Sequence, residues 1–401
     1  MVVYEDASSS AMILGSMKRR DNGPLSEPLT LSIVIPAFNE GPRLIDRAAR
    51  LIDAITAGVI DPRATELILV DDGSTDDTSQ RALDYLGPSF PLMRVLRLEE
   101  NSGKGAAIRV GASAAGAPIV AFMDADMSVD PSQIPMLLAA MADSDVVIGS
   151  RSLADSVVHS AAIHRKVMGR SFSFFVNGVT NVGLKDTQCG FKAFRTPVAR
   201  ILFHLMMVER FAFDVDVLSL ARRLGMRISE VPVDWRAMGN STVRPVADSI
   251  AMARDVFRLH RHKERPSIPA LVIEPAAGPK GQRHRSKLTD SYPALRQTDP
   301  ILPLPHDRAL ILLPLCGLNE IAGTAHRLSL PSTNLRVQNR LVSCAELTEM
   351  MPATWIAGGA ADPGVLQEIR PEFRERRDDR TARHPRQFRQ DELELAFGLE
   401  A

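Results

Sequence analysis

The 401-residue sequence predicts an α/β protein with a single mixed, mostly parallel sheet flanked by helices, followed by a disordered C-terminal tail. Two observations predict the sheet. From Leu29 to about Lys263, short β-branched runs alternate with amphipathic stretches, as in parallel strands with covering helices. Clusters of polar residues follow four successive strand candidates, where the carboxyl ends of parallel strands form a ligand-binding edge.

The predicted elements follow one another at short intervals. We expect strands at 31–36, 66–70, 93–98, 118–123 and 145–150, and helices at 42–57, 74–86, 104–115 and 131–141. The strands are short apolar runs bounded by turn residues, and the helices carry apolar residues at helical spacing. Ser74 or Thr75 is expected to cap the second helix, because short hydroxyl side chains satisfy the free amides of a first turn.

The two ends of the chain differ from this pattern in composition. Residues 1–27 are mainly polar, which favours a flexible lead-in. Residues 266–305 are rich in Pro, Gly, Arg, Lys and Ser, and residues 370–389 are dense in arginine. We therefore expect one domain over 28–265 and a largely disordered tail over 266–401.

Composition excludes several classes of protein. The chain is 45% hydrophobic and 24% charged, and its 48 basic and 48 acidic residues cancel, so no overall field attracts nucleic acid. Cys189, Cys316 and Cys344 are too few and too scattered for a disulfide framework or a zinc site, which fits a reducing, cytoplasmic setting. No apolar run approaches the roughly 18 to 20 residues that span a bilayer, so we expect any membrane association to be peripheral.

The four polar clusters are the candidate ligand site. They are Pro36–Glu40, Asp71–Ser74, Asn101–Gly105 and Asp124–Asp126. One aspartate after a strand is usually a helix cap, but four clusters on successive strands predict a common site. Two carboxylates at one strand end are oxygen ligands of the kind that Mg2+ and Mn2+ prefer, and they can share such an ion with a diphosphate.

These residues carry a resemblance to a known family. Pro-Ala-Phe-Asn-Glu at 36–40, Val-Asp-Asp-Gly-Ser-Thr-Asp at 70–76, Asn-Ser-Gly-Lys-Gly at 101–105 and Met-Asp-Ala-Asp at 123–126 resemble the inverting family 2 glycosyltransferases. That family has the GT-A (nucleotide-diphospho-sugar transferase) fold and includes polyprenyl-phosphate mannose and glucose synthases. The match covers about residues 30–240, and the string Asp-Thr-Gln-Cys-Gly-Phe-Lys at 186–192 resembles dolichyl-phosphate glucosyltransferases.

The resemblance implies a nucleotide-sugar donor site at the strand ends. Asp71 would accept a hydrogen bond from a uracil or guanine base, and Lys104 would approach the diphosphate in a turn whose glycines let the backbone come close. Asp124 and Asp126, the metal ligands, would hold Mg2+ or Mn2+, which offsets charge on the leaving nucleoside diphosphate. The implied donor-binding set is Pro36, Phe38, Glu40, Asp71, Asp72, Gly73, Lys104, Asp124 and Ala125, of which the first three would frame the base and ribose.

Basic residues after the fifth strand indicate a phosphate acceptor. Arg151, Arg165 and Arg170 could supply forked, charge-assisted donors to a lipid phosphate, although each could instead be a solvated surface arginine. Asp186 is the candidate catalytic residue, either as a general base or as a group that positions the acceptor or the sugar. A phosphate, with a second pKa of about 6, hardly needs a base, whereas a sugar hydroxyl would.

Two apolar stretches leave the membrane contact open. Ser171–Leu184 is rich in phenylalanine, and Val246–His262 has Val246, Ile250, Ala253 and Phe257 on one helical stripe and a basic end. Both patterns suit a membrane surface, and both equally suit a helix that packs on the sheet.

The leading hypothesis is transfer of glucose from UDP-glucose to a polyprenyl or dolichyl phosphate, with inversion, at the cytoplasmic face of a membrane. The alternatives are GDP-mannose as donor, a non-lipid acceptor, and an inactive nucleotide-sugar-binding subunit. The intact Asp124, Asp126, Asp71, Lys104 and Asp186 argue against an inactive subunit.

Overall fold

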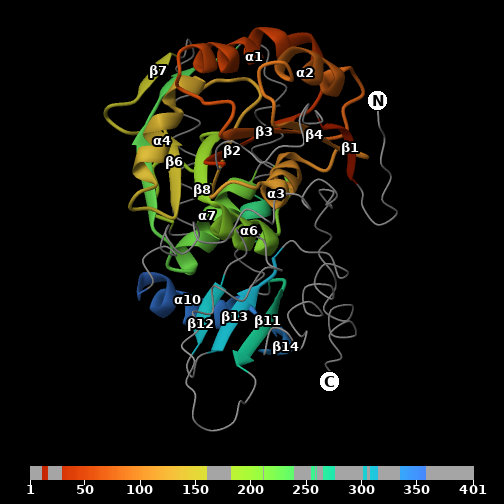
Figure 1. Cartoon of the computed structure of the whole chain (residues 1–401). Coiled ribbons are helices and arrows are strands. Elements are labelled where there is room, and N and C mark those ends of the chain that lie inside the picture. The colour runs from red at the N-terminus through yellow and green to blue at the C-terminus, as the bar shows by residue number, and fades with distance from the viewer. Residues whose placement is uncertain are drawn as a thin grey trace. The chain divides into compact units, whose positions relative to one another are not determined.

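The structure, a computed structural model, describes residues 11–16, 29–159, 182–210, 212–238, 254–257, 259, 265–275, 301–304, 308–314 and 335–357. The chain divides at about Glu264 into two compact units, which are described separately here (Figure 1).

Within the described residues, the first unit is built on an eight-stranded sheet of order β1-β4-β3-β2-β5-β8-β6-β9. The strands are β1 (Ala11–Ser16), β2 (Leu31–Ala37), β3 (Thr65–Asp71), β4 (Met93–Leu98), β5 (Ile119–Met123), β6 (Val146–Ser150), β8 (Phe191–Arg195) and β9 (Ile228–Pro232). β2 is parallel to β3 and β5, whereas β8 runs antiparallel between β5 and β6. The predicted mixed, mostly parallel sheet is confirmed.

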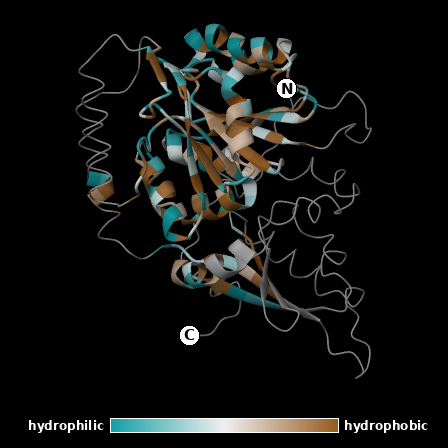
Figure 2. Ribbon diagram, turned by 90° about the vertical axis from the view of Figure 1, so that its left-hand side faces the viewer, coloured by the Kyte–Doolittle hydropathy of each residue, from teal (hydrophilic) through white to brown (hydrophobic). Residues whose placement is uncertain are grey.

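Helices cover both faces of this sheet (Figure 1). α1 (Gly41–Thr56), α2 (Thr78–Leu86) and α4 (Ile134–Ala140), the last preceded by a short 3-10 turn (Pro131–Gln133), share one core with the sheet. α3 (Lys104–Ala114), α6 (Thr196–Leu205) and α7 (Phe213–Arg223) pack on the other face. In Figure 2 the strands of this sheet are mainly coloured as hydrophobic, and the helices also carry hydrophilic residues.

The double cover explains the composition of the strands. Neighbouring residues of a strand point to opposite faces, so Ile33 and Ile35 of β2 enter the core beneath α1 while Val34 faces α3. All three are buried, and β3 is buried along its whole length. A strand that is covered on both sides must be apolar throughout, which is why these strands appear in the sequence as continuous apolar runs.

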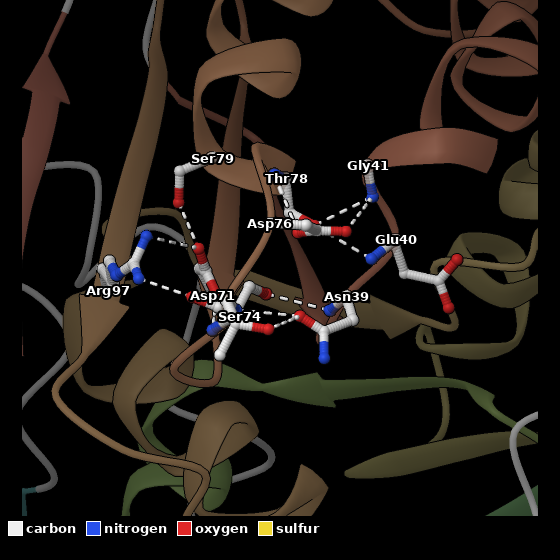
Figure 3. A network of polar contacts seen from close by, with 10 residues as sticks. Asn39, Glu40, Gly41, Asp71, Ser74, Asp76, Thr78, Ser79 and Arg97 are labelled. Atoms are coloured by element: carbon white, nitrogen blue, oxygen red, sulfur yellow. Dashed lines mark hydrogen bonds and ion pairs between the residues drawn. The ribbon is translucent and has the colours of Figure 1, made fainter.

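The start of α2 differs from the prediction. It begins at Thr78 rather than Ser74, because the residues expected to form its first turn bind the loop between β2 and α1 instead (Figure 3). The Ser74 hydroxyl accepts from the amide of Asn39 at 2.9 Å. Asp76 and Thr78 accept from the amide of Gly41 at 3.1 and 2.9 Å. The predicted cap at Ser74 or Thr75 was therefore wrong, and these side chains fasten two loops together.

Parts of both chain ends are ordered where flexibility was expected. Ala11–Ser16 forms β1 against β4, whose edge would otherwise present unpaired backbone groups. In the second unit, β11 (Ile268–Pro275), β12 (Ile301–Leu304), β13 (Arg308–Leu312) and β14 (Leu335–Val342) form an antiparallel sheet, and α10 (Cys344–Ala357) follows.

The expectation of disorder was wrong for these described residues. Their apolar runs are short, but they pair with one another and bury Leu271 and Ile311, which an average over the whole tail conceals. α10 begins with a capping box, in which Ser343 Oγ accepts from the Glu346 amide at 3.2 Å and Glu346 accepts from the Ser343 amide at 2.8 Å. The rest of 1–27 and 266–401 lies outside the described residues.

One described part of the predicted helix at 246–262 packs on the first unit. Val256 is fully buried against Val208, Ala212 and Val215, whereas Phe257, which the predicted stripe placed on the apolar side, is 54% exposed. The buried face is therefore one residue out of register with the prediction. Among the described residues, the structure has no helix with the length and apolarity that a membrane span requires.

Arg109 fixes the position of α3. Its guanidinium is buried and donates to the carbonyls of Phe203 at 3.0 Å and Met206 at 2.8 Å, and it pairs with Glu209 at 2.6 Å. These contacts join the middle of α3 to the end of α6 and the loop after it.

We expect Arg109→Met to lower the free energy of unfolding by about 2–5 kcal/mol, because it leaves buried carbonyls without a donor. The control is Arg81→Met, which removes a well-exposed pair between Arg81 and Asp77 and should cost about 0.5 kcal/mol or less. Urea unfolding of the two variants gives both values. Equal losses would contradict the role assigned to Arg109.

Candidate active site

The loops that follow β2 and β3 form a rigid polar corner of the site (Figure 3). Asn39 adopts a left-handed conformation, with φ of 52°, which asparagine tolerates better than most residues. Its side-chain oxygen accepts from the Thr75 amide at 2.9 Å. Beside this corner Phe38 is 40% exposed, so its ring is available to a planar ligand, whereas Pro36 is partly buried.

Glu40 has its charge engaged within the corner. Its carboxylate pairs with Arg43 at 3.1 Å and with Arg47 at 2.5 Å, and burial raises its pKa even though both arginines oppose that rise. The implied contact of Glu40 with a ribose would therefore require it to leave or share these partners.

Asp71 lies at the end of β3 and is fully buried. It accepts from the Ser74 amide at 2.7 Å and from the Ser79 hydroxyl, and it pairs with Arg97 at 3.5 Å. Both carboxylate oxygens are occupied and solvent does not reach them (Figure 3). These contacts hold the loop before α2, and the implied contact between Asp71 and a nucleotide base stays a prediction.

Asp72 and Gly73 hold the neighbouring loop at 100–103. The Asp72 carboxylate accepts from the amides of Ser102 at 2.8 Å and Gly103 at 2.9 Å, and burial raises its pKa to about 6. Gly73 has φ of 72°, and a Cβ there would lie 2.5 Å from the Glu100 carbonyl carbon. These two members of the implied donor-binding set thus fix the segment that leads into Lys104.

The glycines beside Lys104 serve a different contact from the one implied. A Cβ at Gly103 or Gly105 would lie 2.6 or 2.8 Å from the Glu209 carbonyl oxygen. That oxygen accepts from the amides of Gly105 at 2.7 Å and Ala106 at 3.2 Å, and so caps the start of α3. The close backbone approach within the protein is therefore to the loop before α7, and the Lys104 side chain is directed to Asp124.

Lys104 and Asp124 form the central ion pair of the site. Lys104 Nζ lies 2.5 Å from Asp124 Oδ1, and it is 5.8 Å from the centre of the Phe213 ring. On the other side of Asp124, a Cβ at Gly190 would overlap with the carboxylate, and the Gly190 carbonyl accepts from the Asp124 amide at 3.1 Å. Only glycine at 190 leaves room for this carboxylate.

Asp124 and Asp126 together fit a divalent cation. Burial, and then repulsion by Asp124, raise the pKa of Asp126, so the pair carries more negative charge than its surroundings compensate. Asp126 Oδ1 accepts from the Ser128 amide at 2.9 Å, which directs the carboxylate, and Ala125 between them packs against the core. The described residues contain no group of three or more His, Cys, Asp or Glu side chains suited to a metal, so a ligand would have to complete the coordination.

A buried charge pair behind the site was missed by the sequence reasoning. Lys192 Nζ lies 2.7 Å from Asp214 Oδ1 and donates to the Cys189 carbonyl at 2.6 Å. Burial raises the pKa of Asp214, although Lys192 and Lys104 both oppose that rise. The signal in the sequence was a lysine within the apolar β8 and an aspartate between Phe213 and Val215. Cys189 itself is a buried thiol, and burial raises its pKa to about 12.

Asp186 and Arg151 form a forked pair. Asp186 accepts from Arg151 Nε at 2.7 Å, from Nη2 at 2.9 Å and from the Arg151 amide at 3.0 Å, and also from the Gln188 amide at 3.1 Å. Burial alone would raise the pKa of Asp186, but the bonds from Arg151 outweigh it and hold the pKa below its usual range. A carboxylate with a lowered pKa and both oxygens occupied is a poor proton acceptor.

The guanidinium of Arg151 contacts Trp235, one of the residues that line a pocket at Asp124. It lies over the ring of Trp235, 5.6 Å from the centre, and its side chain is 33% exposed. The pocket is lined by Met123, Asp124, Ser128, Val129, Gly190 and Trp235. Of the three arginines predicted for the acceptor phosphate, Arg151 therefore borders the site, whereas Arg165 and Arg170 lie outside the described residues.

The strand that carries Trp235 is fixed from both sides. β10 (Asp234–Arg236) pairs in parallel with β7 (Val157–His159). The Gln133 side chain donates to the Asp234 carbonyl at 2.9 Å and accepts from the Asp234 amide at 2.8 Å. Trp235 thus presents its ring to Arg151 from a rigid support.

Because the pKa of Asp72 is raised, the stability of the fold should depend on pH. Its folded value of about 6 exceeds the ordinary 3.8, so the folded state binds the proton more tightly and the stability that protonation supplies is lost as pH rises through about 6. Lowering the pH from 7.5 to 5 should therefore stabilise the natural chain relative to Asp72→Asn, as measured by the difference between their free energies of unfolding. Urea unfolding at both values measures it, and a difference independent of pH would contradict the assignment.

Comparisons with known proteins identify the family of the chain. Residues 32–203 match the model of a family described as glycosyl transferase family 2. The chain is 34% identical over 241 residues to a protein named dolichyl-phosphate beta-glucosyltransferase from Dictyostelium discoideum, a match that covers 57% of this chain and 73% of the relative. It is 36% identical over 247 residues to a protein of the same name from Drosophila melanogaster, with 58% and 75% covered.

A solved structure of glucosyl-3-phosphoglycerate synthase from Mycobacterium tuberculosis, in complex with Mg2+ and uridine diphosphate, is 25% identical with a TM-score of 0.43 and covers 58% of this chain and 78% of that one. A similarity at this level says nothing of the ligands of this chain. The two relatives, in contrast, are more than 30% identical and are covered over more than two thirds of their length. The chain therefore belongs to glycosyl transferase family 2, and its mixed, mostly parallel sheet is the GT-A fold predicted for it.

Proposed function

We propose that this chain transfers glucose from UDP-glucose to dolichyl phosphate or a related polyprenyl phosphate, with inversion at the anomeric carbon. The observation that carries the proposal is the 34% and 36% identity to two proteins named dolichyl-phosphate beta-glucosyltransferase. A lipid acceptor would bring the chain to a membrane surface, and we include a peripheral position at the cytoplasmic face in the proposal.

The reaction is a single displacement. An oxygen of the acceptor phosphate attacks C1 of glucose, the bond from C1 to the diphosphate oxygen breaks, and its electron pair leaves with UDP. Attack from the side opposite the leaving group inverts the configuration. Because the second pKa of a phosphate monoester is about 6, the attacking oxygen is already charged at neutral pH and no base has to remove a proton.

The site residues supply positioning and charge. Asp124 and Asp126 would hold Mg2+ or Mn2+, which when bound stabilises the negative charge of the leaving diphosphate. Lys104 brings a further positive charge to the same place. Arg151 lies over Trp235, which lines the pocket beside Asp124, and a guanidinium has N–H donors beyond the two that Asp186 engages, which could meet a phosphate.

Asp186 is a positioning residue in this proposal. Its carboxylate holds both ends of the Arg151 fork, while Trp235 supports the flat face of the guanidinium. Held in this way, Arg151 meets the acceptor phosphate without losing side-chain freedom at the moment of binding. The alternative of a general base would need an acceptor whose hydroxyl proton must be removed.

The first test measures transfer to lipid. The purified chain is incubated with Mn2+, vesicles containing dolichyl phosphate, and radiolabelled UDP-glucose or GDP-mannose in parallel. We expect label to enter the organic phase from UDP-glucose, and Asp126→Asn to lower the rate by roughly 100-fold or more, because it removes one ligand charge from the metal.

The control variant is Asp130→Asn, which makes the same change four residues further on, where the carboxylate caps the 3-10 turn. It should keep most of the rate. Transfer from GDP-mannose alone would show that the donor is GDP-mannose. If label appears only in the water phase, and only when a soluble acceptor is added, the proposed lipid acceptor is wrong.

The second test separates positioning from proton transfer. If Asp186 acts through Arg151, then Asp186→Asn and Arg151→Lys should each raise KM for the acceptor phosphate by roughly tenfold, with KM for UDP-glucose little changed. The double variant should be no worse than either single variant, because both remove the same contact. Losses in kcat that multiply in the double variant would instead indicate a separate chemical role for Asp186.

A further inference from the structure

The donor site contains a positive side chain where a divalent cation is expected to bind. Lys104 Nζ lies 2.5 Å from Asp124 Oδ1, and no other hydrogen-bond donor among the described residues reaches that oxygen. A lysine side chain at its ordinary pKa is protonated at neutral pH. The pair is therefore a true ion pair at an oxygen that would otherwise be open to a metal.

The other carboxylates near Lys104 have partners of their own, which leaves Asp124 as its ion-pair partner. Asp214 is the other buried acid near Lys104, but Lys192 holds it at 2.7 Å. Asp126 directs its Oδ1 to the Ser128 amide. Asp124 is thus the carboxylate of this cluster that Lys104 contacts directly.

The backbone beneath Lys104 is fixed, whereas its side chain can move. Asp72 holds the amide of Gly103, and the Glu209 carbonyl caps the amide of Gly105, one on each side of Lys104. A lysine side chain turns about four bonds and carries three donors at its tip. The ammonium group can therefore change partner by rotation alone, with no rearrangement of α3.

We propose that Lys104 is a resident counter-ion of Asp124, which keeps the cation position filled until the diphosphate of the donor draws the ammonium group away. The inference rests on the proposed nucleotide-sugar donor, and it deepens that proposal by assigning an order to the site. Metal alone must compete with Lys104 for Asp124. A diphosphate offers Lys104 a new anionic partner, releases Asp124, and brings oxygen ligands of its own for the metal.

The consequence is positive coupling between nucleotide and metal. Each ligand removes part of the cost that the other meets, so the affinity of each rises by the same factor when the other is present. In the absence of donor, the ion pair keeps Asp124 neutralised, and the site does not collect metal to which no substrate is attached.

The test measures Mn2+ binding without nucleotide, acceptor or turnover. Titration of the full chain with Mn2+, with free ion followed by electron paramagnetic resonance, gives the affinity of the natural chain and of Lys104→Met. We expect the variant to bind Mn2+ roughly tenfold more tightly or better, because Asp124 and Asp126 are then uncompensated. Asp126→Asn added to Lys104→Met should remove the gain, which places the metal at this pair.

The matched control is Lys185→Met, which removes the same charge from an exposed position of the first unit. Its Mn2+ affinity should stay within about twofold of the natural chain, since exposed charges are screened by salt. Lys104→Gln provides a second variant of similar length, and circular dichroism confirms that each variant is folded. Affinity that is unchanged in both folded Lys104 variants, or raised equally by Lys185→Met, would overturn the proposal.

A second arm adds UDP, with the Mn2+–UDP complex in solution taken into account. UDP should raise the Mn2+ affinity of the natural chain by a larger factor than that of Lys104→Met, since the variant has no ion pair to release. Equal factors would contradict the exchange. If the chain shows this coupling but transfers no sugar to lipid, the counter-ion role of Lys104 stands and the proposed lipid acceptor is wrong. The failure of one proposal can therefore be told from the failure of the other.

Discussion

The cost of burying carboxylates is the constraint on which the site depends. A buried carboxylate destabilises a fold unless a cation or several donors satisfy it, and here each one has a specific partner. Arg151 pairs with Asp186 and Lys192 with Asp214, and Lys104 pairs in the same way with Asp124, whose side chain is partly exposed. Asp71 and Asp72 are satisfied largely by backbone amides and hydroxyls of adjacent loops. These pairings set where each loop lies, and through them the sheet positions the acidic pair and the arginine.

The same pairings divide the polar residues into two kinds. Asp71, Asp72 and Asp186 have their oxygens occupied by the protein and act by holding other groups. Lys104 and Arg151 have partners that a phosphate or a metal could exchange or extend, and both lie beside the pocket or the acidic pair. A motif residue in this fold can therefore be essential to the architecture of the site without contacting the substrate.

Much of this could be predicted from the sequence, and the limits have physical reasons. Strand positions came within about one residue, because a sheet covered on both faces requires apolar strands. The start of α2 was missed, since Ser74 and Asp76 bond to a loop 35 residues away instead of capping their own helix. The Lys192–Asp214 pair and the Glu209 cap are tertiary contacts, which local pattern does not encode. The second sheet was not predicted, because its short apolar strands contribute little to the average composition of a polar tail.

In the proposed reaction, a charged phosphate oxygen displaces UDP in one step, at a site where Arg151 orients the acceptor and the acidic pair supports the leaving group. The anomeric configuration of the product tests this most directly. UDP-glucose carries an α-linked sugar, so proton NMR of the purified glycolipid should show a β-linked glucosyl phosphate. An α-linked product would contradict the proposed single displacement, because retention of configuration requires either a second displacement or a front-side attack.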